Sequence, residues 1–460
     1  MSEELLGLSA LAQADLVRGR RVGAEELARL YLGRIERENP RLNAFVTVLG
    51  EAALREARAR DAAIARGRGD GDALFLGVPV GVKDLDLVRG APARMGSAAY
   101  DWFWSPVDGP TASALRRAGF VITGKLATSE LGALPVTEPD IHPPTRNPFC
   151  PDRSAGGSSG GSGAAIAGRL LPIAPGSDGA GSIRIPAAFC HLYGLKPSRG
   201  RLWGANARID PHAITTVGPL ARSVEDAAAL LDALGGAGTV RAARAPGSFL
   251  DLCRRPISRL RVRFATNSPL GGPVDAPIAG AVRRVAETLA TLGHHVEEGT
   301  VPGGSLDEFL PIWQRQLAQV PLFGEARLQP VTRWLRVEGR KHTAEKIAAL
   351  HGALSARILA AFGDADLWLL PTVPQPAPMV GAFRHLGPEE TFRAVAEYGA
   401  FTAMFNLTGQ PAASLPMGLG TAGAPIGVQL AGRPGADGAV LAISREIEEA
   451  LPWASVKPPV

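Results

Sequence analysis

The sequence predicts an α/β fold built around a β-sheet that is buried on both faces. Short apolar runs separated by glycine alternate along the chain with segments of helical periodicity, and this alternation is typical of α/β proteins. The apolar runs carry hydrophobic residues at consecutive positions, which indicates strands covered by helices on both sides. We expect the 460 residues to form one domain, although this length would also allow about three.

The N-terminal residues 1–70 are predicted to form a helical arm, because large apolar residues recur at intervals of three and four positions. The next region, at about 74–230, changes character and forms the predicted core. Apolar runs at 78–82 and 120–123 predict buried strands, and a helix at 111–117 lies between them.

The region that follows is less regular. A polar connection rich in glycine and proline occupies 235–260, and a strand at 261–265 and a helix at 276–292 come after it. Residues 305–362 are again largely helical.

The C-terminal part returns to the sheet. Strand character at 366–374 and at 401–432 precedes a closing helix at 436–451. We find no internal repeat.

Composition and charge restrict the function. Hydrophobic residues make up 46% and charged residues 20%, so the chain is not intrinsically disordered. The formal net charge is +5 and the arginines are scattered, so nucleic acid is not an expected partner. The three cysteines have neither disulfide-framework nor zinc-site spacing, which fits a reducing cytoplasm. No obvious secretion signal or long apolar run is present, so we expect neither export nor a membrane partner.

The most informative segment is rich in glycine and serine. Residues 156–163 read GGSSGGSG, and residues 177–186 read SDGAGSIRIP. By composition alone, the first run would be a flexible linker. It joins no change in composition, however, and it leads into the small apolar residues 164–167. We therefore expect its glycines to be packed.

Two known motifs fit this sequence less well. Residues 156–160 match the G-x-S-x-G turn of α/β-hydrolases, but no apolar strand precedes them. Residues 119–125 resemble a phosphate-binding loop, but Leu126 follows them instead of serine or threonine. We therefore do not expect a nucleotide site.

The spacing of Lys83, Ser158 and Ser182 closely resembles that of the amidase signature family. Residues 156–187 follow the long signature of that family, including Arg184 and Pro186. Further matching motifs are GVPVGVKD at 77–84, GLKP at 194–197, GPLAR at 218–222, FNLTGQP at 405–411 and GVQLAG at 427–432. The resemblance covers nearly the whole chain and is weakest at 235–365.

The resemblance implies the fold in more detail. It implies a single large domain, residues 1–460, with a central mixed and twisted β-sheet covered by helices on both faces. A variable region at about 235–400 would form much of the substrate pocket, and residues 401–460 would return to the sheet.

The resemblance further implies a Ser-Ser-Lys triad that hydrolyses the C–N bond of a carboxylic amide and releases carboxylate and ammonia or an amine. Ser182 would be the nucleophile that forms an acyl-enzyme, Ser158 would follow a cis peptide bond and bridge to the base, and Lys83 would be that base. This chemistry needs a neutral lysine, whose pKa must fall from about 10.4 through burial or nearby positive charge. The alternative is a solvated lysine at the end of a strand, which is the commoner place for this residue.

Neighbouring residues would support this chemistry. The resemblance implies an oxyanion hole made by the backbone amides of Gly179, Ala180, Gly181 and Ser182. Asp178 and Arg184 are expected to hold the loop by an ion pair, and Ser159 to support the hydroxyl network. Neither a metal ion nor an organic cofactor is expected.

The expected partner is a small-molecule amide substrate, and the sequence leaves a monomer and a homodimer both open. Aromatic residues of the variable region could line an apolar acyl site, although for any single one we favour a place in the core: Trp313, Phe323, Trp334, Trp368 and the adjoining Phe401. Two alternative functions use the same site. One is an acyl-transferring tailoring amidase, and the other is the glutaminase-type subunit of a tRNA-dependent amidotransferase. Ile185 disfavours the second, because that subunit generally carries glutamine there.

Overall fold

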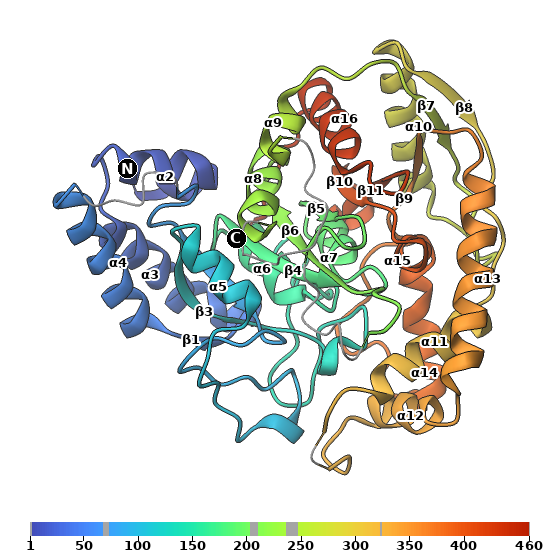
Figure 1. The fold of residues 1–460 in the computed structure, drawn as a ribbon, viewed down its shortest axis with the longest axis horizontal. Helices are drawn as coiled ribbons and strands as arrows, with labels where there is room; N and C mark the ends of the chain where they lie inside the picture. The colour runs from blue at the N-terminus through green and yellow to red at the C-terminus, as the bar shows by residue number, and fades with distance from the viewer. Residues whose placement is uncertain (1, 68–72, 203–209, 236–246, 323, 460) are drawn as a thin grey trace.

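The computed structural model describes residues 2–67, 73–202, 210–235, 247–322 and 324–459, and these ranges form an α/β molecule (Figure 1). The predicted fold class is confirmed. The strands are β1 (Phe45–Val48), β2 (Pro79–Lys83), β3 (Val121–Leu126), β4 (Ile173–Asp178), β5 (Tyr193–Lys196), β6 (Thr216–Ala221), β7 (Arg261–Phe264), β8 (His295–Glu298), β9 (Leu367–Pro371), β10 (Ala412–Leu419) and β11 (Pro425–Gly432).

The α-helices are α1 (Ser2–Gly7), α2 (Ala10–Arg18), α3 (Ala24–Leu42), α4 (Gly50–Ala65), α5 (Pro110–Arg117), α6 (Gly160–Ala167), α7 (Arg184–Phe189), α8 (Val224–Gly235), α9 (Phe249–Arg254), α10 (Ala276–Thr291), α11 (Leu306–Ala318), α12 (Pro330–Gly339), α13 (Ala344–Phe362), α14 (Pro388–Ala396), α15 (Ala403–Thr408) and α16 (Asp437–Ala450). Short 3₁₀ helices are η1 (Ala98–Tyr100), η2 (Glu130–Gly132), η3 (Glu397–Gly399) and η4 (Thr421–Gly423).

The central sheet is mixed, as expected. Its strand order is β4-β6-β5-β10-β11-β9-β7-β8. Neighbours from β4 to β9 are antiparallel, whereas β7 runs parallel to both β9 and β8. A second sheet, of order β1-β3-β2, was not predicted. Strand β2 of this smaller sheet packs against β4 at the edge of the central sheet, so the end of β2 reaches the middle of the molecule.

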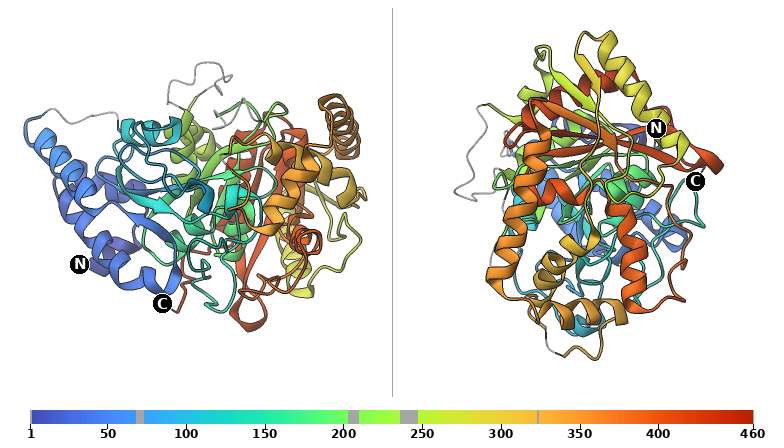
Figure 2. Two further views of the ribbon diagram at one scale, coloured as in Figure 1. Left: turned by 90° about the horizontal axis from the view of Figure 1, so that it is seen from below. Right: turned by 90° about the vertical axis from the view of Figure 1, so that its right-hand side faces the viewer.

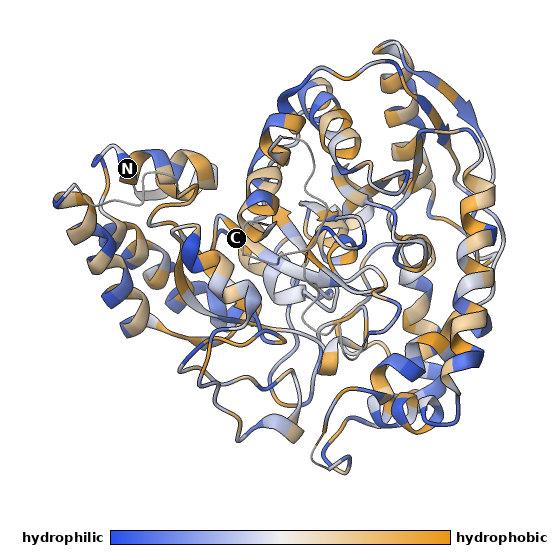
Figure 3. Cartoon of the chain, viewed as in Figure 1, coloured by the Kyte–Doolittle hydropathy of each residue, from blue (hydrophilic) through white to orange (hydrophobic). Residues whose placement is uncertain are grey.

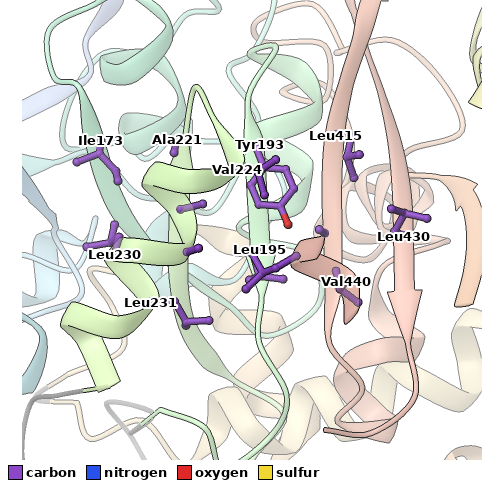
Figure 4. Packing of buried hydrophobic residues seen from close by; sticks show 14 of the residues in the cluster. Ile173, Tyr193, Leu195, Ala221, Val224, Leu230, Leu231, Leu415, Leu430 and Val440 are labelled. Carbon is purple, nitrogen blue, oxygen red and sulfur yellow. The ribbon is translucent and has the colours of Figure 1, made fainter. Parts of the chain in front are cut away.

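Helices cover both faces of the central sheet. Helices α8, α16 and α10 pack on one face, and Figure 4 shows the core between α8, α16 and the strands. In β5 the side chains of Tyr193 and Leu195 point into this core (Figure 4). Gly194 faces the other way, where a Cβ atom would lie 2.6 Å from Ala187 Cβ of α7. Because strand side chains alternate between faces, α7 covers the opposite face and packs unusually close to it.

The N-terminal arm lies at one end of the molecule, and residues of about 300–400 lie at the opposite end (Figures 1 and 2). The predicted helical periodicity of the arm is confirmed by α1 to α4, but strand β1 interrupts it. This strand was missed because it forms only by antiparallel pairing with β3, far along the chain. The arm is therefore joined to the smaller sheet.

The outer helices are amphipathic. Figure 3 shows hydrophilic and hydrophobic residues side by side along α3 and α13. In the described parts of the chain, no helix combines the length and the apolar character that crossing a membrane requires.

Two further predictions are corrected by the structure. The stretch at 401–432 is predicted to be strand-rich, but its first part forms the helix α15, and Gly409 after this helix has the left-handed conformation (φ 75°). The polar connection at 235–260 contains the helix α9, and its residues 236–246 lie outside the described residues. Tertiary contacts of α15 with α13 and of α9 with α8 and α16 stabilise these short helices.

Candidate active site

The glycine- and serine-rich run at 156–163 is fully buried and is not a linker. Its second half forms the first turns of α6. A Cβ atom at Gly161 would lie 2.3 Å from the backbone nitrogen of Ala127, so only glycine allows these two segments to approach so closely. The peptide bond between Gly157 and Ser158 is cis, as the resemblance implied.

Lys83 is the last residue of β2, and its side chain is buried. Its Nζ atom lies 2.8 Å from Ser158 Oγ, 2.9 Å from Ser159 Oγ and 2.9 Å from Ser177 Oγ. The alternative of a solvated lysine at a strand end is therefore wrong. Two of these three serines were candidates from the sequence, and the structure brings both to the amine.

The hydrogen bonds of Ser159 orient the protons around Lys83. The Ser159 hydroxyl donates to the carbonyl oxygen of Ser177 at 3.3 Å, so it accepts from Nζ at 2.9 Å. A neutral amine has two N–H donors and one lone pair. Because Ser159 accepts one of these hydrogens, the lone pair of a neutral Lys83 faces either Ser158 or Ser177. A neutral amine can accept a proton from that hydroxyl.

The surroundings of Lys83 also favour its neutral form. Burial lowers the pKa of Lys83 from 10.5 to about 7, against the opposing effect of the carboxylates of Asp86 and Asp178. A large fraction of this amine is therefore unprotonated near neutral pH. Burial thus supplies the low pKa that the sequence argument required.

The loop before Ser182 is held by a buried carboxylate. Asp178 accepts the amide hydrogens of Gly181 at 2.7 Å and Ile183 at 3.1 Å, and its ion pair with Arg184 measures 2.9 Å. Burial would raise the pKa of Asp178, but the Arg184 guanidinium outweighs this effect and holds that pKa far below its usual range. The expected supporting ion pair is present.

Arg184 extends this network to the C-terminal part of the chain. It donates to Gln429 Oε1 at 2.7 Å and to Asn406 Oδ1 at 2.6 Å. The sequence analysis assigned no role to these two amide side chains. In the sequence, the only indication that they have a role was that each is an amide within a largely apolar motif, FNLTGQP or GVQLAG.

Ser182 ends this loop, and 8% of the residue is exposed. Within the described ranges, its hydroxyl makes no hydrogen bond to the protein, and the amides of Gly179, Ala180 and Ser182 have no acceptor. The amide of Gly181 differs, because it donates to Asp178. Three of the four amides expected in the oxyanion hole are thus available to a ligand.

Two cavities meet at Ser182. The first we call the apolar cavity; it is lined mainly by hydrophobic residues, including Leu134, Ile185, Phe309, Phe392 and Met404. The second we call the polar cavity, because its lining includes Asp86, Ser158, Ser177, Thr215 and Gln316. Its other walls are apolar and include Leu85, Leu131, Val217, Leu317 and Val320. Ser182 and Trp313 line both cavities.

Among the aromatic residues considered for the pocket, Trp313 stands between the two cavities, where its Nε1 donates to the Ala133 carbonyl at 3.1 Å. Trp334, Trp368 and Phe401 pack in hydrophobic clusters and line neither cavity. Phe323 lies outside the described residues.

The polar cavity contains residues that sequence reasoning missed. Ser177 directly precedes Asp178, and Asp86 follows Lys83 by three positions, so both were close to noted motifs. Nothing in the sequence indicated that Thr215 and Gln316 would line this cavity. Among the described residues, no group of three or more His, Cys, Asp or Glu side chains lies close enough together to bind a metal ion.

Comparison with known proteins agrees with this fold and shows the family. The Amidase family model matches residues 26–319 and 322–441. A protein of Synechocystis sp. that is provisionally named an amidase is 36% identical over 453 residues, which cover 96% of this chain and 88% of that protein.

Two solved structures extend the similarity. The structure of 6-aminohexanoate cyclic dimer hydrolase complexed with substrate has a TM-score of 0.89 and 31% identity, and the match covers 99% of both chains. A bacterial aryl acylamidase of the amidase signature family has a TM-score of 0.86 and 27% identity, with 97% of each chain covered. The family match spans almost the whole chain, and the relatives share its fold throughout, so this chain belongs to the amidase signature family of amide-hydrolysing enzymes.

Proposed function

We propose that this enzyme hydrolyses a small-molecule carboxylic amide through an acyl-serine intermediate, with Ser182 as nucleophile, Ser158 as proton bridge and Lys83 as base. The observation that carries the proposal is the position of the buried Lys83 amine, 2.8 Å from Ser158 Oγ, in a cavity that Ser182 also lines. A serine hydroxyl becomes an effective nucleophile when a nearby base can accept its proton.

Acylation begins as Ser182 Oγ attacks the carbonyl carbon. The Ser182 proton passes to Ser158 Oγ while the Ser158 proton passes to neutral Lys83, so the amine becomes an ammonium. When the tetrahedral intermediate collapses, the C–N bond breaks and the departing nitrogen takes a proton from Ser158. Lys83 returns its extra proton to Ser158 and becomes neutral again.

Deacylation repeats the relay with water. Water attacks the acyl carbon, its proton moves through Ser158 to Lys83, and Ser182 recovers a proton as the C–O bond to the enzyme breaks. The products are a carboxylic acid and ammonia or an amine, and no atom is left on the protein.

The amides of Gly179, Ala180 and Ser182 stabilise the oxyanion in both steps. They have no acceptor in the described structure, so they can bind developing negative charge without first breaking another bond. The Gly181 amide instead fixes the loop through Asp178. The ion pair of Asp178 with Arg184 keeps these donors in place.

The test compares three serine and lysine variants with one matched control. Ser182→Ala and Lys83→Ala each lower kcat/KM by about three orders of magnitude or more, because the members of such a unit depend on one another. Ser162→Ala is the control, since Ser162 is also a buried serine of the same run but donates to the Pro175 carbonyl at 2.9 Å and has no bond to Lys83. For Ser158→Ala we expect a kcat/KM below that of the Ser162→Ala control and no lower than those of Ser182→Ala and Lys83→Ala.

A second readout locates the nucleophile. A fluorophosphonate probe, followed by peptide mass spectrometry, is expected to label Ser182 in the wild type and in Ser162→Ala. Normal turnover by Ser182→Ala, or labelling at another serine, contradicts the proposal. Adding competing amines to the assay separates hydrolysis from acyl transfer, because a transferase would form new amides from the same acyl-enzyme.

A further inference from the structure

The cavity on one side of Ser182 is unlike the cavity on the other. Ser158 lines the polar cavity and does not line the apolar cavity, whereas Ser182 lines both. On the proposed mechanism, Ser158 gives its proton to the departing nitrogen, so that nitrogen must lie within hydrogen-bond reach of Ser158 Oγ. The amine half of the substrate therefore occupies the polar cavity, and the acyl half occupies the apolar cavity.

The polar cavity contains a carboxylate that the mechanism does not use. Asp86 is buried, and its Oδ1 accepts a long hydrogen bond from Thr111 Oγ1 at 3.2 Å. Within the described ranges it forms no ion pair. Burial raises the pKa of Asp86 above its usual value, and the charges of Lys125 and Lys83 offset this effect only in part.

The other acids near Lys83 are already paired with cations. Asp84 forms a buried ion pair with Lys125 at 2.7 Å, and Asp178 forms one with Arg184 at 2.9 Å. Lys83 must be neutral to act as a base. Asp86 therefore has no cation paired with it, although the charge of Lys125 acts on its carboxyl group. A positive charge brought by the substrate would favour the ionised form of this buried carboxyl group and would be bound there.

We propose that Asp86 selects substrates whose amine half carries a second, protonated nitrogen, such as a monoamide of a diamine with an apolar acyl group. This inference deepens the proposed function and rests on it. Two other lining residues fit the same ligand, since Gln316 Nε2 donates to Thr215 Oγ1 at 2.8 Å. This bond leaves the Gln316 side-chain oxygen available to N–H donors.

Binding of such a cation would also favour catalysis. An ammonium group near Asp86 takes the place of protonated Lys83 as the neighbour of that carboxylate. Like charges repel, so the bound cation shifts Lys83 toward its neutral form. Substrate recognition and activation of the base are then linked by one side chain.

The experiment compares pairs of phenylacetyl amides that differ only in the amine. One member of each pair has an N-(2-aminoethyl), N-(3-aminopropyl) or N-(4-aminobutyl) group, and the other has the neutral alkyl group of the same length. For the wild type, kcat/KM for at least one charged member exceeds that of its neutral partner by about tenfold or more, which equals about 1.4 kcal/mol. Asp86→Asn, a change of almost equal volume, brings this ratio close to one.

Two further variants complete the test. Gln316→Lys places a positive charge in the same cavity and lowers the ratio as well. Glu308→Gln is the matched control, because it makes the same carboxylate-to-amide change at the apolar cavity, where Glu308 pairs with Arg357 at 2.8 Å; it leaves the ratio as in the wild type. Ratios cancel changes in folded fraction, so a poorly folding variant still gives a clear result.

The inference is overturned if the wild type has equal kcat/KM for the neutral and the charged members of every pair. It is also overturned if Asp86→Asn keeps the wild-type ratio. Phenylacetyl p-nitrophenyl ester and the fluorophosphonate label separate this failure from that of the mechanism. Ester turnover and labelling at Ser182 without any preference for charged amines reject only the role of Asp86. Loss of Ser182 labelling rejects the proposed function itself.

Discussion

Lys83 is the residue on which the proposed chemistry depends, and on that proposal its burial has opposite effects on catalysis and on stability. The same desolvation that lowers its pKa to about 7 makes the ammonium form costly inside the fold. Three serine hydroxyl oxygens within 2.9 Å surround the amine in place of water. These contacts orient the amine without adding a negative charge that would restore its usual pKa.

The first prediction at this scale concerns the pH dependence of activity. Only neutral Lys83 accepts a proton, and its pKa is about 7, so kcat/KM for a neutral amide rises through about pH 7 and reaches a plateau above it. Initial rates from pH 5 to 9 check this. A rise of kcat/KM centred near pH 10 instead would show that the lysine titrates as an exposed one. Ser162→Ala should keep the wild-type profile.

The second prediction concerns stability. Above pH 7 the folded protein releases the Lys83 proton, while the unfolded chain keeps it up to about pH 10.5. The unfolded state then binds more protons, so the free energy of unfolding rises with pH in this window. Lys83→Met lacks this contribution. The wild type therefore gains stability relative to Lys83→Met from pH 7 to 9, by about 1 kcal/mol or more.

Urea unfolding of both proteins at the two pH values measures this difference. Other titrating groups are common to the two proteins and largely cancel. The same difference at pH 7 and at pH 9 would mean that Lys83 has equal pKa values in the folded and unfolded states.

At the scale of elements, the site depends on backbones that approach without side chains between them. Helix α6 begins inside the site because glycines let its first turn pack on the segment around Ala127. Strand β2 ends at Lys83, so the strand direction delivers the amine to the serines. Helix α15 places Asn406 against Asp178 and Arg184.

The third prediction tests this packing with two identical substitutions. Gly161→Ala introduces a Cβ atom 2.3 Å from the Ala127 nitrogen, so the backbone must shift and the protein loses about 1–3 kcal/mol or more. Gly352→Ala on α13 has no atom within 4 Å of the new Cβ and gains up to about 1 kcal/mol from helix propensity. Thermal unfolding and soluble yield compare the two. Equal midpoints would mean that the start of α6 is not tightly packed.

At the scale of the whole molecule, the site joins parts of the chain that are far apart in sequence. The Arg184 guanidinium contacts Gln429, which is 245 positions away, and Lys83 contacts Ser177 across 94 positions. The apolar cavity adds side chains of α11, α13 and α14 to the signature loop. The N-terminal arm and the residues of about 300–400 lie at opposite ends of the molecule (Figure 2). The fold is therefore needed as a unit to complete the site.

Much of this arrangement could be predicted from local patterns. Helices such as α5, α10 and α16, and strands such as β2, β3 and β7, fall within a few residues of their predicted ranges, because periodicity and glycine boundaries act over neighbouring residues. Strand β1 and helix α15 were missed, because pairing with β3 and packing against α13 decide their conformation.

The sequence by itself determined the family, the α/β class and the three residues proposed for catalysis, because motif spacing and residue chemistry are written along the chain. Only the tertiary structure decided that Ser177 completes the surroundings of Lys83, that the Gly181 amide donates to Asp178, and that two cavities with different linings meet at Ser182. The physical reason is that desolvation, hydrogen-bond satisfaction and cavity shape depend on distances through space, and residues such as Asp86 and Gln316 approach one cavity only after the chain has folded.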